Sequence, residues 1–260
     1  MTQAEYWARQ RVIITAGATG IGLEIARAML DQGASVWVCD LTEDALAAAR
    51  AALPGLKTFV ADVSEADACE AFVKAATDDM GGLDILVNNA GIAGPAKAVE
   101  EISTEDWTRC FAVNVNGQFF MARAAIPHLK KNDGGSIVCM ASVAGKYAFG
   151  LRSPYAASKA AVISLARALS VELGPNQIRV NAIAPGVVAG DRIRRVFTDR
   201  AATRGISYDE MAAVALRAVS MKTMVEPEEI AALVLYLTSP SGRPISGQVM
   251  QICGGLEYTE

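Results

Sequence analysis

The sequence predicts an α/β fold in which helices cover both faces of a parallel sheet. Short apolar segments rich in valine and isoleucine alternate along the chain with longer segments of helical periodicity. The short segments are apolar almost throughout instead of at every second residue, as expected of strands buried on both faces. With 52% hydrophobic residues among 260, the chain is also long enough to bury a substantial core.

The elements are expected in a regular order along the chain. Seven runs of mainly apolar or β-branched residues predict strands over 11–15, 35–39, 58–60, 84–87, 136–140, 178–183 and 248–252. Segments with apolar residues three or four apart, or rich in alanine, predict helices over 20–30, 43–52, 65–79, 105–129, 155–173 and 228–237. Residues 187–225 break the alternation, because they are helical and charged and contain no strand. No linker or low-complexity tract divides the chain, so we expect a single domain over residues 1–260.

The composition excludes several classes of function. The formal net charge is −4 and no basic run occurs, which argues against nucleic acid or an anionic membrane as a partner. His128 is the only histidine, which excludes a histidine-rich zinc centre, and we expect no metal site. The five cysteines are widely spaced without a C-x-x-C pair, so we expect neither disulfides nor metal-binding thiolates.

The N-terminal residues indicate the compartment. The first ten residues include Glu5 and Arg9 and lack the apolar core of a secretory signal. No apolar run approaches the roughly 18 residues of a membrane span. We therefore expect a cytoplasmic protein.

A glycine-rich turn follows the first predicted strand. It reads Thr15-Ala16-Gly17-Ala18-Thr19-Gly20-Ile21-Gly22. Glycines in such a turn let a pyrophosphate approach the backbone, where the free amides at the helix N-terminus favour its charge. Asp40 stands at the end of the second strand, where a carboxylate would bind a ribose diol. The alternative is a turn without a ligand, in which Asp40 is the N-cap of the next helix.

Tyr155 and Lys159 form a second candidate site. Residues four apart on a helix share one face. A tyrosine, with an ordinary pKa of about 10, is a poor base at neutral pH, and cationic charge from Lys159 and an oxidised nicotinamide would favour its phenolate. Ser142, at the end of the fifth strand, could hydrogen-bond a substrate oxygen. Alone, a Y-x-x-x-K spacing is also typical of a solvated helix face.

Together these motifs resemble those of the short-chain dehydrogenase/reductase family in its single-domain form. The resemblance runs from Arg11 to Gly255 and also rests on Asp62-Val63, Asn88-Asn89-Ala90-Gly91, Asn114 and Pro185-Gly186. It implies a doubly wound Rossmann-type three-layer sandwich with a seven-stranded parallel sheet in the order 3-2-1-4-5-6-7. It also implies an alcohol dehydrogenase or ketoreductase that uses NAD(P), with residues 187–225 as a lid over the substrate.

The resemblance assigns a role to each site residue. Tyr155 would be the acid/base, Ser142 would orient the substrate oxygen, Lys159 would hold the ribose and tune Tyr155, and Asn114 would support a water that passes protons to Lys159. The residues implied to bind the cofactor are Gly17, Thr19, Gly20, Ile21, Gly22, Asp40, Leu41, Asp62, Val63, Asn89, Ala90, Gly91, Tyr155, Lys159, Pro185, Gly186 and Val188.

Three positions depart from the family pattern. Ala16 replaces the usual first glycine of the turn, where its methyl group crowds the backbone. Gly190 stands where a threonine usually meets the nicotinamide amide, so another group must replace that contact. Cys253 replaces the usual aspartate before Gly254-Gly255, and we expect this change to affect a C-terminal turn or a subunit contact.

Charged residues indicate which cofactor and which substrate the protein would bind. The Asp40 carboxylate would accept hydrogen bonds from a ribose diol and repel a 2′-phosphate, so we expect NAD in preference to NADP. The candidate substrate-binding residues are Ser142, Lys146, Tyr147, Arg152, Tyr155 and Arg192. The arginine-rich segment 192–204 favours a polar or anionic substrate such as a sugar-derived hydroxy acid, unless it is simply a solvated lid helix. Tyr147 and Phe149 would equally suit a cyclic alcohol.

Assembly and the class of activity complete the expectations. Small residues on the helix after Tyr155 allow close helix approach, and the resemblance implies a homotetramer or homodimer. The alternative function is an NAD(H)-binding sensor or scaffold on the same fold, since fold alone does not fix function. An enoyl reductase is disfavoured, because the family variants with that activity space tyrosine and lysine further apart.

Overall fold

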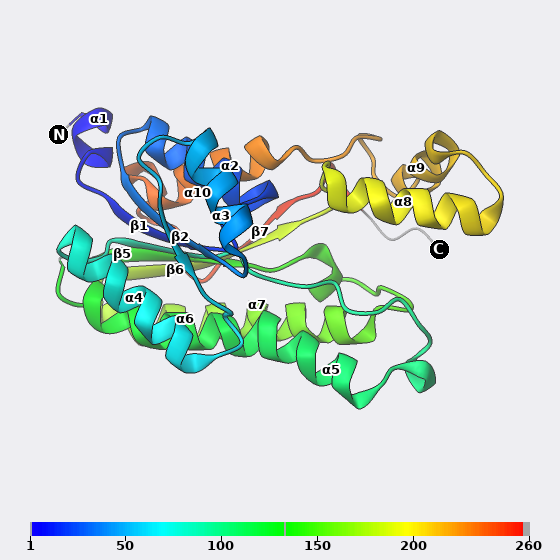
Figure 1. Cartoon of the computed structure of the whole chain (residues 1–260), viewed down its shortest axis with the longest axis horizontal. Coiled ribbons are helices and arrows are strands. Elements are labelled where there is room, and N and C mark those ends of the chain that lie inside the picture. The colour runs from blue at the N-terminus through cyan, green and yellow to red at the C-terminus, as the bar shows by residue number, and fades with distance from the viewer. Residues whose placement is uncertain (1, 133, 257–260) are drawn as a thin grey trace.

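The computed structural model describes residues 2–132 and 134–256, apart from the side chains at 192, 199, 200 and 203 (Figure 1). In the described residues one sheet has the strand order β3-β2-β1-β4-β5-β6-β7, and each neighbouring pair is parallel. The strands are β1 (Arg11–Thr15), β2 (Ser35–Asp40), β3 (Lys57–Val60), β4 (Ile85–Asn88), β5 (Gly135–Met140), β6 (Ile178–Pro185) and β7 (Val249–Ile252). The predicted architecture and strand order are confirmed.

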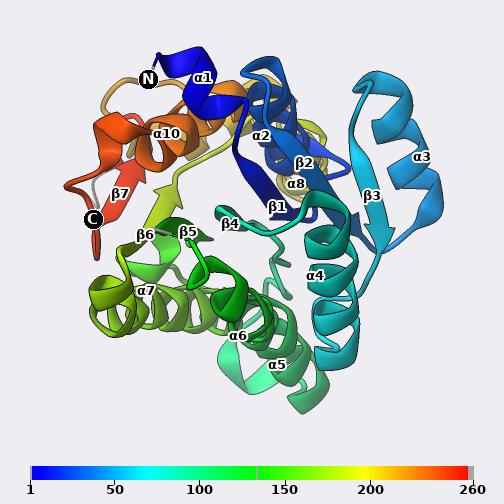
Figure 2. The ribbon, with the colours of Figure 1, turned by 90° about the vertical axis from the view of Figure 1, so that its left-hand side faces the viewer.

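Helices form a layer on each side of this sheet (Figures 1 and 2). One layer contains α4 (Ala66–Met80), α5 (Thr104–Phe111), α6 (Gly117–Leu129) and α7 (Ser153–Leu173). The other contains α1 (Gln3–Trp7), α2 (Gly20–Asp31), α3 (Glu43–Ala52) and α10 (Pro227–Thr238). Two further helices, α8 (Asp191–Arg204) and α9 (Tyr208–Leu216), lie beyond the end of the sheet.

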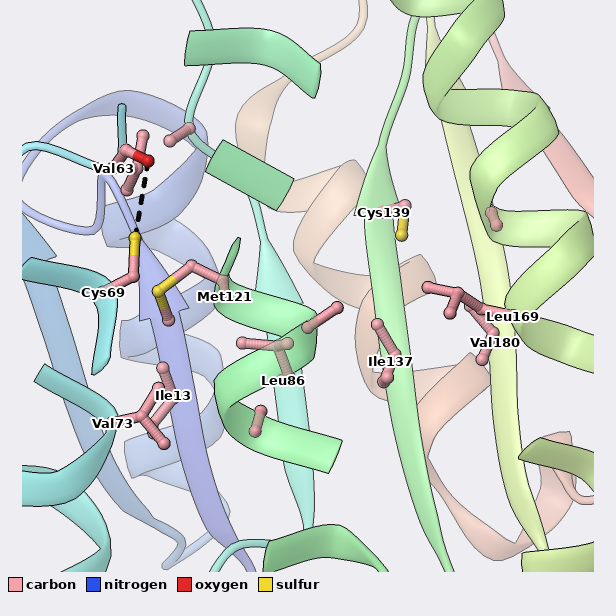
Figure 3. Close-up of a cluster of buried hydrophobic side chains, with 14 of the residues drawn as sticks. Ile13, Val63, Cys69, Val73, Leu86, Met121, Ile137, Cys139, Leu169 and Val180 are labelled. Atoms are coloured by element: carbon pink, nitrogen blue, oxygen red, sulfur yellow. Dashed lines mark hydrogen bonds between the residues drawn. The ribbon is translucent and has the colours of Figure 1, made fainter. Parts of the chain in front are cut away.

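The strands are apolar throughout because each face of the sheet is covered. Ile13 of β1 belongs to a core cluster with Phe72 of α4 and Met121 of α6, part of which Figure 3 shows. Its neighbour Val12 belongs to the cluster on the other face, together with Ile25 of α2. Successive strand residues point to opposite faces, so burial on both sides requires an unbroken apolar run.

The predicted long helix over 105–129 is wrong in one respect, because it is interrupted. Residues Ala112–Asn116 form a π-helical turn between α5 and α6. Within that turn, Asn114 donates through Nδ2 to the carbonyl of Ile92 (3.0 Å) and accepts from the Ile92 N–H through Oδ1 (2.7 Å). A π-turn of this kind is frequent at functional sites. Periodicity alone did not reveal it, since the apolar pattern continues through the turn.

Helix α1 was not predicted. Its N-cap Thr2 and Glu5 form a capping box, and Trp7 is buried at 1% exposure. The Tyr6 hydroxyl donates to the carbonyl of Thr238 at the end of α10 (2.6 Å). The Thr-x-x-Glu pattern was a signal for this helix that the sequence interpretation missed.

The segment that contains α8 and α9 has its own small apolar cluster of Phe197, Ala201 and Met211. The two ends of this segment are joined, because the N–H of Ala189 donates to the carbonyl of Val225 (2.8 Å) and the N–H of Val225 donates to that of Val187 (2.8 Å). Residues 187–225 therefore form an excursion after β6 whose two ends lie side by side just before α10. Among the described residues, no helix is long and apolar enough to cross a bilayer.

Candidate active site

The loops after β1 and β4 are joined at the carboxyl edge of the sheet. The Thr15 hydroxyl accepts from the N–H groups of Asn89 (3.0 Å) and Ala90 (2.9 Å). The Asn89 side chain donates back to the carbonyls of Thr15 (3.1 Å) and Ala16 (3.0 Å). Because parallel strands end at one edge, the two motifs that lie far apart in the sequence form one surface.

The glycine turn leaves no room for side chains at two positions. A Cβ at Gly17 would lie 2.5 Å from the Cβ of Val38, and one at Gly22 would lie 2.1 Å from the Ala16 carbonyl oxygen. Gly20 begins α2 with φ +53°. Thr19, the N-cap of α2, makes no side-chain hydrogen bond to the first amides of the helix, which leaves them available to an anion. This turn fits a pyrophosphate.

Ala16 takes a left-handed backbone conformation, with φ +50°. This region suits glycine, which is the residue expected here from the family pattern, and costs other L-residues roughly 1–2 kcal/mol. The turn therefore keeps its glycine-like geometry with an alanine in place, and the strain falls on Ala16.

Asp40 lies against the glycine turn. Its carboxylate accepts from the N–H of Ala18 (3.1 Å) and from its neighbour Leu41 (2.8 Å). The alternative role as N-cap of α3 is wrong, because Thr42 caps that helix through the N–H of Ala45. A carboxylate thus stands at the end of β2, beside the turn that would hold the pyrophosphate.

Asp62 and Val63 follow β3. The Asp62 carboxylate accepts from both the N–H (2.9 Å) and the hydroxyl (2.7 Å) of Ser64, which fixes its orientation. Val63 is buried at 7% exposure and packs against Gly117, where a Cβ would lie 2.9 Å from Val63 Cγ2. Because β3 runs parallel to β2 and β1, both residues lie at the same edge of the sheet as the glycine turn.

Lys159 meets Tyr155 above the end of β5. Its Nζ donates to the carbonyl of Met140 (2.8 Å) and lies 5.8 Å from the centroid of the Tyr155 ring. The lysine is buried at 3% exposure. Ser142, two residues after Met140, begins a 3₁₀ turn over Val143–Gly145 and accepts from the N–H of Ala144 (3.2 Å).

Gly91 lies against both Asn114 and Lys159. A Cβ at residue 91 would lie 3.0 Å from Lys159 Nζ and 3.1 Å from Asn114 Oδ1. Three of the four predicted catalytic residues therefore lie together, because Lys159 lies beside the Tyr155 ring and lies with Asn114 against Gly91, and Ser142 follows the strand whose Met140 carbonyl holds Lys159. A side chain at residue 91 would crowd both polar atoms, which would have to shift by a few tenths of an ångström.

Two polar residues of this region were missed by the sequence interpretation. Gln118 is buried at 2% exposure and donates to the Met140 carbonyl (3.2 Å), the acceptor that Lys159 also uses. Ser158 is fully buried between Tyr155 and Asn114. No periodicity or motif singles out either residue, because their environment depends on how α6 and α7 pack.

The turn after β6 carries the remaining predicted cofactor residues. Gly186 donates to the carbonyl of Ile252 (2.9 Å), and a Cβ on it would lie 2.8 Å from Cys253 Cα. Cys253 Sγ accepts from the N–H of Leu256 (3.4 Å), so this residue belongs to the expected C-terminal turn. Gly190 is the N-cap of α8 with φ +131°, a conformation that L side chains rarely adopt, so a threonine does not fit this backbone.

The predicted substrate residues divide into two groups. Arg152, at the N-terminus of α7, donates to the carbonyls of Ala93 (3.4 Å) and Gly94 (3.3 Å). Lys146 donates to the side chain of Gln251 on β7 (2.8 Å), and Gln251 donates to the Tyr147 hydroxyl (2.9 Å). Gln251 was not predicted. The side chain of Arg192 lies outside the described residues.

The fold and these residues define a class of protein, a dinucleotide-binding oxidoreductase. A family model described as "Enoyl-(Acyl carrier protein) reductase" matches residues 15–257. The chain is 36% identical to galactitol 2-dehydrogenase of Agrobacterium fabrum, over 94% of this chain and 95% of the relative. It is 33% identical to D-beta-hydroxybutyrate dehydrogenase of Cupriavidus necator, over 94% and 96% respectively.

A solved structure of NAD⁺-bound xylitol dehydrogenase superimposes with a TM-score of 0.88 at 27% identity, covering 95% of this chain and 98% of that one. The chain belongs to the short-chain dehydrogenase/reductase family. Members of this family are oxidoreductases that bind nicotinamide cofactors, and the relatives here are named as dehydrogenases of galactitol, D-beta-hydroxybutyrate and xylitol.

Proposed function

We propose that this protein is an NAD-dependent oxidoreductase that interconverts a secondary alcohol and a ketone. The observation that supports this most directly is the buried Lys159 ammonium, held by Met140 and lying 5.8 Å from the Tyr155 ring. When bound, the cofactor would accept or return the hydride. The start of α2 fits such a ligand, because a Cβ at Gly20 would meet nothing within 4 Å and Thr19 makes no side-chain hydrogen bond to the first amides of the helix.

In this proposal the chain's own residues handle the proton. Tyr155 takes the hydroxyl proton of the alcohol during oxidation and returns it during reduction. The Lys159 ammonium, whose Nζ lies 5.8 Å from the Tyr155 ring centroid, would hold the ribose of the cofactor. Ser142 donates a hydrogen bond to the substrate oxygen, and Asn114 supports the water through which protons reach Lys159.

The preference for NAD rests on Asp40. Its carboxylate lies on the glycine turn through the N–H of Ala18, at the place where the adenosine ribose of the cofactor would lie. A 2′-phosphate there would meet this negative charge, and residues 16–21 include no arginine or lysine to offset it. The NAD⁺-bound xylitol dehydrogenase supports the same choice.

For the substrate, we propose a polar or anionic hydroxy compound, sugar-derived or cyclic. Arg152 lies three residues before Tyr155 and beside the loop after β4, where its guanidinium could bind a carboxylate. The names of the two relatives support a hydroxylated substrate, one being a polyol dehydrogenase and the other a hydroxy-acid dehydrogenase. The four-residue spacing of Tyr155 and Lys159 favours a carbinol or ketone over the enoyl substrate of the family model's description.

We also propose a cytoplasmic homotetramer or homodimer built from a single domain, with residues 187–225 as the lid. Along α7 the small residues Ala160, Ser164 and Ala168 are all exposed at a spacing of four, which allows another helix to approach closely. Light scattering tests this assembly, and a monomer at micromolar concentration contradicts it.

A screen of NADH formation over sugars, sugar acids, polyols and cyclic alcohols tests the function. We expect turnover with at least one group of these alcohols and loss of turnover in Tyr155→Phe. Tight NAD binding without turnover on the whole panel would instead favour a cofactor-sensing protein.

A further inference from the structure

We propose that Ser158 is a positioning residue that fixes the side-chain amide of Asn114 beside Lys159. The proposal rests on the proposed function, because it concerns the proton route of that reaction. Ser158 has no assigned role in it. The residue lies on α7, between Tyr155 and Lys159, and is fully buried at 0% exposure.

A directed chain of hydrogen bonds runs through Ser158. Its hydroxyl donates to the carbonyl of Tyr155, one turn earlier in α7 (2.8 Å). Because the hydroxyl has one hydrogen, the Ser158 oxygen is left as an acceptor, and Asn114 Nδ2 donates to it (2.9 Å). The Asn114 amide is thereby oriented with its nitrogen toward α7.

The other end of the amide follows from this orientation. With Nδ2 toward Ser158, the Asn114 Oδ1 faces the N–H of Ile92 and accepts from it (2.7 Å). A rotated amide would place an oxygen opposite the Ile92 carbonyl and an NH₂ group opposite the Ile92 N–H. Asn114 is itself 0% exposed, so no solvent would compensate for such a mismatch.

Cys110 also lies beside Asn114, but it cannot replace Ser158 as the hydrogen-bond acceptor. Its Sγ lies 3.4 Å from Asn114 Nδ2 and 3.7 Å from Ser158 Oγ. Sulfur is a weak acceptor. Burial raises the pKa of the Cys110 thiol, so it stays neutral and offers no charge to the amide.

The consequence for the reaction comes through Gly91. Asn114 Oδ1 and Lys159 Nζ both lie against its α-carbon, at 3.1 Å and 3.0 Å from the position of a Cβ. The oxygen that Ser158 orients is therefore a neighbour of the ammonium that acts on Tyr155. Loss of the Ser158 hydroxyl leaves the Asn114 amide held only by the main chain of Ile92, so the amide beside Lys159 becomes less rigid.

Helix α7 provides a matched control. The hydroxyl of Ser170 donates to the carbonyl of Arg167 (2.7 Å), the same bond one turn back that Ser158 makes to Tyr155. Ser170 lies far along the helix from Tyr155 and has no asparagine donor. Ser170→Ala removes the shared local interaction alone, and Ser158→Ala removes it together with the contact to Asn114.

The first test is a cycle of the variants Ser158→Ala, Asn114→Ala and the double variant, with Ser170→Ala as control. We expect Ser158→Ala to lower kcat about fivefold to tenfold, the value of one buried hydrogen bond, with KM for NAD within twofold of the wild type. The pH profile of kcat should shift in Ser158→Ala but not in Ser170→Ala. The double variant should be no slower than Asn114→Ala, because each change breaks the same hydrogen bond between Ser158 and Asn114.

Additive losses in the double variant, or a Ser158→Ala profile equal to that of Ser170→Ala, would overturn the proposal. If Ser158→Ala does not fold, Ser158→Cys takes its place in the cycle. Cysteine is close to serine in side-chain volume, and its thiol forms only a weak hydrogen bond. The same expectations then apply.

A second readout requires neither substrate nor turnover. Amide hydrogen exchange of residues 110–116 should be faster in Ser158→Ala than in Ser170→Ala, because the π-helical turn loses its link to α7. If the wild type oxidises no alcohol, the proposed function fails while this measurement still decides the link between Ser158 and Asn114. Equal exchange in the two variants contradicts the link whatever the activity.

Discussion

The Nζ atom of Lys159 donates to the carbonyl of Met140 at 2.8 Å and lies 5.8 Å from the ring centroid of Tyr155. Met140 ends β5, and Ser142 follows two residues later, so one strand end holds the lysine and presents the serine. A lysine buried at 3% exposure is costly unless its ammonium is hydrogen-bonded or paired, and the Met140 carbonyl is one such acceptor.

Replacement of Lys159 by Met should remove the charge while it keeps most of the side-chain volume. We expect kcat/KM for alcohol oxidation to fall at least about 100-fold, the range of general acid–base contributions. Initial rates of NADH formation measure the effect. Lys130→Met, a change at an exposed lysine after α6, should leave the rate within twofold, and equal losses in both variants would contradict the assignment.

Ala16 predicts a stabilising substitution. Its φ of +50° suits glycine, so Ala16→Gly should raise the free energy of unfolding by about 0.5–1 kcal/mol, because the relief of strain outweighs the added flexibility of the unfolded chain. Urea unfolding followed by circular dichroism measures it. Ala18→Gly is the control in the same turn, since Ala18 has no positive φ and is buried, and it should lower stability.

Asp40 should set the choice between cofactors. Asp40→Ala removes the negative charge that would face a 2′-phosphate. We expect the ratio of kcat/KM for NAD over NADP to fall at least about tenfold, which is the effect of losing one charged interaction. Asp44→Ala, at the exposed start of α3, should leave the ratio unchanged. Comparable kcat/KM of the wild type with the two cofactors would refute the preference.

Arg152 should recognise an anionic substrate. Arg152→Met should raise KM for a hydroxy acid about tenfold, because a charge-assisted hydrogen bond is lost, with little change for a neutral alcohol. Arg192→Ala and Arg195→Ala test the lid in the same assay. If KM for the acid is unchanged in all three variants, recognition of the acid by these arginines is ruled out. Arg50→Met on α3 serves as the remote control.

Cys69 predicts a loss of stability at alkaline pH. Burial raises the pKa of its thiol from the ordinary value of 9.0 to about 11. Between these values the folded chain binds a proton that the unfolded chain has released, so the free energy of unfolding falls as the pH rises from 9.0 toward 11. Urea unfolding under reducing conditions should show a shallower decline in Cys69→Ala than in the wild type, and parallel declines would contradict this origin.

The fold was largely predictable because each strand and each turn is specified locally. Apolar runs such as 11–15 and glycine or proline breakers such as Pro54-Gly55 depend on neighbouring residues alone. The predicted helix over 105–129 was the exception. In its π-turn Asn114 binds the main chain of Ile92, 22 residues earlier, and no local pattern contains that contact.

The residues of the candidate site also fall into two groups, those recognisable from the sequence and those whose surroundings depend on packing. Tyr155, Lys159 and Ser142 were recognisable from their spacing and position, and Asn114 from the resemblance to the family. Gln118, Ser158 and Gln251 were not, because nothing in their neighbouring residues shows that they face Met140, Asn114 and Lys146.

By itself, then, the sequence determined the parallel sheet, its order of elements, and the residue types that chemistry at its carboxyl edge requires. Hydrophobic periodicity and turn chemistry act over a few residues, so they are written in the chain. The tertiary structure decided which polar atoms meet: Lys159 with Met140, Ser158 with Asn114, and Lys146 with Gln251 across 105 residues. Buried polar atoms must find partners wherever packing places them, and that placement exists only in the folded chain.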